Sequence, residues 1–320
     1  MHIYELTWPQ PLPQPGMPSA HVVALGDFDG MHLGHREVIG RALRTARSLG
    51  LPATVMTFDP HPRAVLGQSK YEQSLTPLPD KLELLRDMGI DCIYVVTFDR
   101  TFAALSPAQF VEEVLTPLGV NTAIVGFDFT FGHLGAGTAD SLTDLAHGRF
   151  TVEVVRPYHL HEIKVGSTVI REYVESGQVD RAAELLGRPY CIQGTVVHGH
   201  ARGRTIGFPT ANIAPHELYV MPPNGVYAVH AHVGGHTYGG VMNIGLRPTF
   251  KDGDSSVSLE AHLFDFDRDI YGETIAVSFV RMLRGERKFP AVSDLIAQIG
   301  RDSDEARRLL AERPPGINIG

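Results

Sequence analysis

Residues 20–187 alternate short, continuous apolar runs with amphipathic segments. HVVALG (21–26) and ATVMTF (53–58) are apolar throughout, as strands are when helices cover both faces of a parallel sheet. REVIGRALRTARSLG (36–50) and LPDKLELLRDMG (78–89) have helical periodicity. We therefore expect a doubly wound, Rossmann-like α/β domain whose ligands bind beyond the carboxyl ends of the strands. The same alternation continues at CIYVVTF (92–98), SPAQFVEEVL (106–115) and TAIVGF (122–127).

From Tyr190 the pattern changes to strand-like segments without intervening helices. Gly234-Gly235 separates two of these segments, as a two-residue hairpin turn does. One clear helix follows, at 291–312. This half predicts an antiparallel β-barrel with a C-terminal helix. The strand-like segments are 191–199, 225–233, 236–245, 255–266 and 273–283.

We expect three segments along the chain. Residues 1–19 hold five prolines between Pro9 and Pro18, which predicts an extended arm rather than a folded element. Residues 20–187 form the α/β domain and 188–320 the barrel. The charge changes at the same boundary: 1–187 carry 14 Lys and Arg against 22 Asp and Glu, and 188–320 carry 14 against 14.

Composition excludes several classes of protein. Of 320 residues, 43% are hydrophobic and 20% charged, with a net charge of −8, so the chain is neither disordered nor a nucleic-acid binder held by charge. Cys92 and Cys191 are far from any CxxC spacing and indicate a reducing compartment. We find no signal peptide and no apolar run long enough to span a membrane. We therefore expect a cytoplasmic protein.

The segment GDFDGMHLGH (26–35) follows a strand and opens a helix. Gly30 and Gly34 let the backbone approach a ligand closely, and the free N–H groups of a helix N-terminus favour phosphate. His32 and His35 are three residues apart, so both can donate to charge that develops on a transferred group. The pattern predicts nucleotide chemistry without a Walker lysine.

Three other segments supply polar groups where strands or helices of this domain end. Asp59 and His61 follow the strand at 53–58, and Asp128 follows the strand at 122–127. GSTVIR (166–171) opens a helix that Ser167 and Thr168 can cap, with Arg171 able to bind phosphate. Their common position indicates one site.

A second constellation, VHGHARGRTIGFPTANI (197–213), lies in the barrel half. Its glycines and basic side chains suggest a phosphate cradle. Thr210 and Asn212 offer two neutral oxygens on one side of an extended segment, which suits Mg²⁺. The alternative is a Gly-rich connection between barrel strands.

Four motifs of the first half resemble the adenylyltransferase module of bacterial bifunctional riboflavin kinase/FMN adenylyltransferases (FAD synthetases): G-x-F-D-G-x-H-x-G-H, F-D-P-H-P, V-G-x-D-F-x-F-G and S-T-x-I-R. The resemblance implies that His32 and His35 stabilise the transferring phosphoryl group. Gly166 replaces a common Ser and Phe127 a frequent polar residue, which bears on nucleotide contacts and not on the reaction class. The implied ATP and FMN contacts are Gly26, Phe28, Asp29, Gly34, Asp59, His61, Asp128, Ser167, Thr168 and Arg171.

The second half resembles the flavokinase module of the same family. G-x-x-x-G-R-x-x-G-F-P-T-A-N is complete from Gly199 to Asn212. The resemblance implies Mg²⁺ at Thr210 and Asn212, Glu260 as catalytic base, and flavin contacts at 246–250 and in the helix after Phe289. The implied ATP and flavin contacts are Gly199, Arg202, Gly203, Gly207, Phe208, Pro209, Thr210, Asn212 and Arg284.

The resemblance covers residues 20–312 and implies two successive reactions. ATP phosphorylates riboflavin to FMN in the barrel, where a carboxylate can accept the proton of the hydroxyl. A second ATP then adenylylates FMN to FAD and pyrophosphate in the first domain, where an ionised phosphate needs no general base. We expect small-molecule substrates, no nucleic-acid or membrane partner, and a monomer or weak homo-oligomer.

Three alternatives predict different observations. A metal-dependent phosphohydrolase using His32, His35 and His61 would hold zinc or manganese. A riboflavin kinase whose first domain has lost adenylyl transfer would make FMN but no FAD. A flavin-binding regulator would lack Glu260 or the Thr210–Asn212 pair, and neither is missing.

Overall fold

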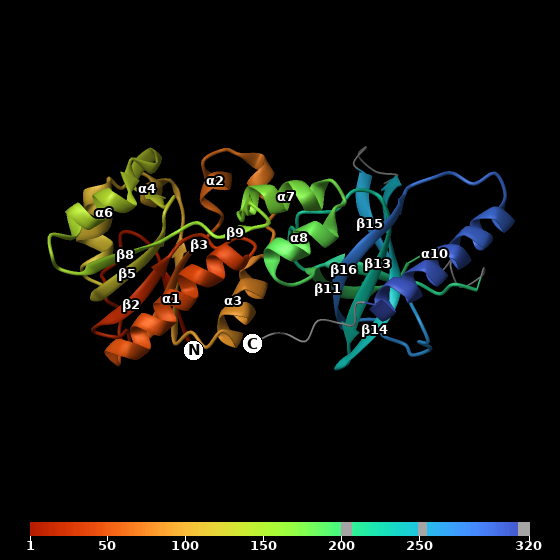
Figure 1. Ribbon diagram of the computed structural model, residues 1–320, viewed down its shortest axis with the longest axis horizontal. Coiled ribbons are helices and arrows are strands. Elements are labelled where there is room, and N and C mark those ends of the chain that lie inside the picture. Colours follow the sequence, from red (N-terminus) through yellow and green to blue (C-terminus); the bar gives the residue numbers. More distant parts are fainter. Residues whose placement is uncertain (200–206, 249–254, 313–320) are drawn as a thin grey trace. The chain divides into compact units, whose positions relative to one another are not determined.

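The computed structural model describes residues 1–199, 207–248 and 255–312, and the chain forms two compact units that meet in sequence at Ser167 and Thr168 (Figure 1). The first unit is built on a six-stranded sheet with the order β1-β4-β3-β2-β5-β8, in which every neighbouring pair is parallel. The strands are β1 (His2–Leu6), β2 (His21–Leu25), β3 (Ala53–Asp59), β4 (Cys92–Thr97), β5 (Val120–Gly126) and β8 (Thr151–Val155).

Helices cover both faces of this sheet, which confirms the predicted doubly wound fold. On one face α1 (Leu33–Leu49) and α3 (Leu78–Asp87) pack against alternate residues of β2, β3 and β4. On the other face the segment from α4 (Arg100–Ala103) to Leu118 and helix α6 (Ala139–Ala146) contribute residues such as Phe110 and Leu142. The strand order reverses at β2, between β3 and β5, and ligands of such sheets bind at this switch point.

The remaining elements of this unit are short. The helical ones are α2 (Pro62–Val65), α4 (Arg100–Ala103), α5 (Pro107–Gln109), the π-helical turn Phe110–Leu115, and 3₁₀ turns at Ser69–Tyr71 and His133–Gly135. The strands are β6 (Thr130–Phe131) with β7 (Gly137–Thr138), and β9 (His159–Leu160) with β10 (Ile163–Lys164).

The N-terminal segment corrects one expectation. The prolines predict an extended arm over residues 1–19, but His2–Leu6 forms the edge strand β1 and pairs in parallel with β4. Leu6 is buried in the core, and Trp8, Leu12 and Met17 pack against the same cluster. The prediction was wrong because the prolines begin only at Pro9 and leave the five preceding residues free to pair.

The second unit is a closed barrel with the order β11-β12-β15-β14-β13-β16, and all its pairs are antiparallel. Gly234 and Gly235, at φ 57° and 77°, form the predicted turn between β13 and β14. The long helix α10 (Val292–Glu312) packs on β13, β14 and β16. The strands are β11 (Tyr190–Val197), β12 (Ala211–Pro215), β13 (Gly225–Val233), β14 (His236–Pro248), β15 (Ser255–Leu263) and β16 (Thr274–Gly285).

Two helices precede the barrel in the chain, α7 (Ser167–Glu175) and α8 (Val179–Leu186). Helix α8 packs against β11 and β16 of the barrel and buries Val179 and Leu185. The two compact units therefore meet earlier in the sequence than the expected boundary at Gly187. Over the described residues, no helix is both long enough and apolar enough to cross a membrane.

Two candidate active sites

The turn between β2 and α1 has an unusual backbone. Gly30 has φ 87°, as its lack of a side chain allows, but Phe28 and Met31 also have positive φ, at 56° and 45°. Such conformations cost an L-residue about 1–3 kcal/mol each and concentrate at functional sites. Both side chains are buried, so packing holds the turn in this strained path.

The path ends at two stacked histidines. The rings of His32 and His35 lie 3.5 Å apart between centroids, at 19°. His32 is the N-cap of α1, and its Nδ1 accepts a hydrogen bond of 3.1 Å from the backbone N–H of His35. Because Nδ1 accepts, the proton of the neutral ring is on Nε2, where it can be donated to an anion.

Two glycines make room for the ring of His32 and for that of Phe28, which packs edge-on against His35 at 5.3 Å between centroids. A Cβ on Gly34 would lie 3.2 Å from the ring of His32, and a Cβ on Gly26 would lie 3.0 Å from the ring of Phe28. Gly34 also lies next to the backbone of Val165. The glycines of the motif therefore allow close packing around the histidines.

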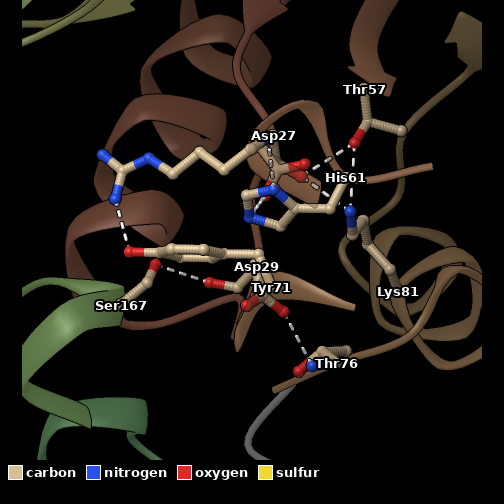
Figure 2. A network of polar contacts seen from close by, with 9 residues as sticks. Asp27, Asp29, Thr57, His61, Tyr71, Thr76, Lys81 and Ser167 are labelled. Atoms are coloured by element: carbon tan, nitrogen blue, oxygen red, sulfur yellow. Dashed lines mark hydrogen bonds and ion pairs between the residues drawn. The ribbon is translucent and has the colours of Figure 1, made fainter. Parts of the chain in front are cut away.

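Asp29 joins three segments of the unit (Figure 2). Its side chain is buried and its Oδ1 accepts a hydrogen bond of 3.0 Å from Thr76 N–H. Its backbone carbonyl accepts one of 2.8 Å from Ser167 Oγ. Asp29 thus fixes the β2–α1 turn and brings Ser167, which begins α7, to the same place.

His61 lies beside the carboxylate of Asp27 (Figure 2). Its Nε2 is 3.2 Å from the Asp27 carboxylate, and its Nδ1 accepts from Arg63 N–H as the N-cap of α2. Both ring nitrogens are therefore engaged, which leaves His61 as a positioned neighbour of the turn.

Lys81 belongs to this network, although the sequence motifs do not predict it. It is only 4% exposed, and its Nζ donates to the Asp27 carbonyl at 2.6 Å and to Thr57 Oγ1 at 3.1 Å. The available signal was its position: Lys81 shares the apolar face of α3 with Leu78, Leu82 and Leu85, spaced at i, i+3 and i+4.

The two strand-end carboxylates have different surroundings. Desolvation and the nearby Asp27 raise the pKa of Asp59, whereas the charge of Lys81 lowers it. Asp128 is exposed and forms an ion pair of 2.9 Å with Lys164. The Lys164 ammonium also lies 4.3 Å from the centroid of the Phe127 ring.

The remaining residues of the first motif set lie on or just before α7. Thr168 is exposed and Arg171 is 1% exposed, both within the second compact unit. A Cβ on Gly166 would meet no atom within 4 Å, so the serine common in the family would fit here.

The barrel contains a cavity of about 400 Å³ at the mouth formed by β11, β12 and β15. The segment from Phe266 to Tyr271 forms its other wall. Gly199, Pro209, Thr210 and Asn212 line it, so the structure brings four residues of the second motif to one pocket.

Strand register places Asn212 beside Glu260. These two residues are directly paired across β12 and β15, and such pairs have Cβ atoms about 4.5–5.5 Å apart on one face. Ser258 Oγ donates to Glu260 Oε1 at 3.0 Å. A Cβ on Gly199 would lie 2.1 Å from Asn212 Nδ2, so only glycine fits against this amide.

The start of β12 is held by His262. Its Nδ1 donates to the Pro209 carbonyl at 2.8 Å, and its ring meets Phe208 edge-on at 5.4 Å between centroids. Gly207 is exposed at φ 87°. Arg202 and Gly203, and the end of the predicted flavin contact at 249–250, lie outside the described residues.

Arg284 has a structural partner. Its Nε and one terminal nitrogen each lie 2.9 Å from Asp302 Oδ2 on α10, and Asp302 is 5% exposed. This ion pair joins β16 to α10. A role of Arg284 in binding ATP or flavin stays a prediction.

The donor chemistry of the barrel site fits a hard cation. A hydroxyl at Thr210 and a buried amide at Asn212, with the Glu260 carboxylate alongside, supply the oxygen ligands that Mg²⁺ prefers. Among the described residues no group of three or more His, Cys, Asp or Glu side chains is arranged to hold a metal ion.

Comparisons with known proteins find relatives for both halves of the chain. A family model for FAD synthetase matches residues 15–169, and one for riboflavin kinase matches 186–310. A protein of Bacillus subtilis called "Bifunctional riboflavin kinase/FMN adenylyltransferase" is 45% identical over 289 residues, covering 90% of this chain and 92% of its own. A protein of Escherichia coli K12 with the same name is 37% identical over 298 residues, covering 92% and 94%.

One solved structure also covers most of the chain. It is titled as a macrolide-efflux protein from Streptococcus pneumoniae, and it superposes with a TM-score of 0.85 at 35% identity. It covers 91% of this chain and 95% of its own. The likeness shows that the two units occur together in another protein of known structure.

Proposed function

The chain belongs to the family of bifunctional riboflavin kinase/FMN adenylyltransferases, and we propose that its two units divide the two reactions between them. The protein is a transferase of FAD biosynthesis: it phosphorylates riboflavin to FMN and adenylylates FMN to FAD, with ATP as co-substrate of both steps. A kinase without adenylyl transfer is not favoured, because residues 15–169 match the FAD synthetase model.

Riboflavin phosphorylation belongs to the barrel in this proposal. The 5′-hydroxyl of riboflavin attacks the γ-phosphorus of ATP, ADP leaves, and Glu260 accepts the proton of the hydroxyl. The hydrogen bond from Ser258 orients this carboxylate. The cavity beside Thr210 and Asn212 receives the substrates.

Mg²⁺ accompanies ATP in this site. Thr210 and Asn212 would hold it with their side-chain oxygens, and its charge would neutralise the phosphates. Gly199 leaves room for the Asn212 amide, which the side chain of any larger residue at position 199 would displace.

FMN adenylylation belongs to residues 20–187, which comprise most of the first unit and the helices α7 and α8 that follow it in the chain. The FMN phosphate attacks the α-phosphorus of ATP, and pyrophosphate leaves. His32 donates from Nε2 to the charge that develops on the transferred group, with His35 stacked behind it. Arg171, Ser167 and Thr168 bind the pyrophosphate end. The FMN phosphate is already ionised at pH 7, so this step requires positioning and no general base.

The protein's partners are small molecules. We propose that it acts in the cytoplasm as a monomer or weak homo-oligomer, without nucleic acid. The net charge of −8 supports the absence of a nucleic-acid partner, because it disfavours nonspecific binding to nucleic acid.

The observation that carries the division of labour is the presence of two separate polar constellations, at the carboxyl ends of the β-sheet and at the mouth of the barrel. The test is to incubate the pure protein with riboflavin, ATP and Mg²⁺ and to separate the flavins by chromatography. We expect FMN first and FAD afterwards. FMN without FAD would contradict the bifunctional assignment.

Two variants test the partition of residues. Glu260→Ala should lower riboflavin phosphorylation by at least about a hundredfold and still convert supplied FMN to FAD. His32→Ala combined with His35→Ala should do the reverse. Loss of both activities in either folded variant would show that the sites are divided incorrectly.

A further inference from the structure

Lys81 is a buried cation that the two reactions, as described, do not use. Its ammonium lies against the β2–α1 turn and donates hydrogen bonds to the Asp27 carbonyl and Thr57 Oγ1 (Figure 2). Burying an ammonium is costly, and at a position on the apolar face of α3 a leucine or methionine would pack without that cost. The cation therefore serves some purpose other than filling the core.

Lys81 helps to hold one backbone carbonyl of the turn, that of Asp27. The Asp27 carbonyl accepts from Lys81 Nζ at 2.6 Å and from Thr57 Oγ1 at 2.8 Å. Two residues later, Asp29 Oδ1 accepts from Thr76 N–H, just before α3. The strained residue Phe28 thus lies between two points that β3 and the start of α3 hold fixed.

The charge of Lys81 also matches its surroundings. The carboxylates of Asp27 and Asp59 stand at the ends of β2 and β3, where the phosphates of ATP and FMN are expected to bind. The ammonium counteracts the upward shift that burial and Asp27 impose on the pKa of Asp59. Without a cation, this edge of the sheet would repel phosphate more strongly.

We propose that Lys81 is a positioning residue for FMN adenylylation, which fixes the Asp27 carbonyl and through it the strained turn that carries His32 and His35. The proposal rests on the assignment of FMN adenylylation to the first unit. Lys81 touches neither substrate in this role, since its ammonium is enclosed behind the turn.

The test measures both activities of the full-length protein. In Lys81→Met we expect kcat for FMN adenylylation to fall on the order of a hundredfold, as for a misplacement of catalytic groups by about 1 Å. KM for ATP and FMN should change by less than about threefold, because the residues that contact the ligands remain. Riboflavin phosphorylation by the same preparation should be unchanged. Lys70→Met, a change of an exposed lysine in the same unit, is the matched control and should adenylylate FMN within twofold of the wild type.

Further variants distinguish positioning from packing. The fluorescence of Trp8, the single tryptophan, reports whether the first unit of each variant is folded at the assay temperature. Thr57→Val removes the second donor to the Asp27 carbonyl, and we expect it to lower kcat for FMN adenylylation less than Lys81→Met does. The double variant Lys81→Met/Thr57→Val should lose clearly more or less than the product of the single losses, because both residues act on one group.

Two outcomes would overturn the proposal. One is wild-type kcat in folded Lys81→Met. The other is losses in Lys81→Met and Thr57→Val that simply multiply, which would mean that the two residues act independently. A wild-type protein that makes no FAD would instead refute the assignment of adenylyl transfer itself.

Discussion

At the residue scale, the proton of His32 is placed by its neighbour in the helix. The N–H of His35 occupies Nδ1, so that Nε2 carries the proton of the neutral ring. The sequence predicts both histidines from their spacing of three residues. It does not predict that their rings stack at 3.5 Å, because ring orientation depends on the strained turn before them.

His21 is a buried histidine without a chemical role. Neither ring nitrogen has a hydrogen-bond partner among the described residues, and the ring packs edge-on against Tyr94 at 5.3 Å between centroids. Burial lowers the pKa of His21 from 6.5 to about 4. The unfolded chain therefore binds a proton more readily than the folded one between these values.

This shift predicts a pH-dependent stability of the first unit. The stability is full above pH 6.5 and falls as the pH drops toward 4, by about 3 kcal/mol in total. Urea unfolding followed by Trp8 fluorescence at several pH values measures it. His21→Phe should flatten this slope and the exposed-site variant His159→Phe should not. Equal slopes in the wild type and His21→Phe would refute the assignment.

Gly199 gives a second prediction at this scale. In Gly199→Ala the new Cβ would clash with the Asn212 amide, so we expect riboflavin phosphorylation to fall at least about tenfold, by displacement of a substrate-binding group. FMN adenylylation should be unchanged. Gly285→Ala, where a Cβ meets nothing within 4 Å, is the matched control in the same barrel. Wild-type kinase activity in Gly199→Ala would contradict the close packing.

At the scale of elements, the apolar runs of the first unit predict β2, β3, β4 and β5 within a residue or two. The edge strand β1 is not predicted, because only Leu6 of its five residues is buried and its hydrophobic pattern is too weak to indicate a strand. An edge strand needs only one partner, and that partner, β4, lies about 90 residues away in the sequence. Pairing across such a distance is decided by tertiary structure.

The strand β1 can be tested through its one buried side chain. Leu6→Ala should destabilise the first unit by about 2–3 kcal/mol, because it leaves a cavity in the buried apolar cluster, next to Val96 of the paired strand β4. Ile3→Ala, at a position 43% exposed, should change the free energy of unfolding by less than about 0.5 kcal/mol. Urea unfolding followed by Trp8 fluorescence measures both. Equal, small effects would mean that β1 is not part of the folded core.

At the scale of the whole molecule, the two units carry different chemistry on different folds. The parallel sheet gathers strand ends at one edge, and the barrel brings β12 and β15 side by side at its mouth. Charge is unequal as well: the net −8 falls within residues 1–187. In the proposed function, local donors such as His32 and the N-terminus of α1 therefore bind phosphates against the net charge of their own domain.

The boundary between the units has a measurable consequence. A fragment 168–320 keeps α8, whose buried residues cover β11 and β16, whereas 188–320 exposes that apolar surface. We expect the shorter fragment to melt at least about 10 °C below the longer one. On warming, it should lose riboflavin phosphorylation at a lower temperature than the longer fragment does. Calorimetry of both fragments measures this. Identical melting temperatures would place the boundary at Gly187.

The sequence by itself determined the fold class of each half, the reactions and most of the residues proposed for them. The fold class follows from periodicity, and the candidate residues follow from motifs whose members are close together in the chain, since local spacing decides which side chains share a helix end or a strand. The reactions are what the resemblance of these motifs to a known family implies. Only the tertiary structure decided that Asn212 pairs with Glu260, that His2–Leu6 completes the sheet, and that Lys81 donates a hydrogen bond to the β2–α1 turn. Each of these joins residues more than 45 positions apart, and no local pattern records which distant partner a side chain will meet.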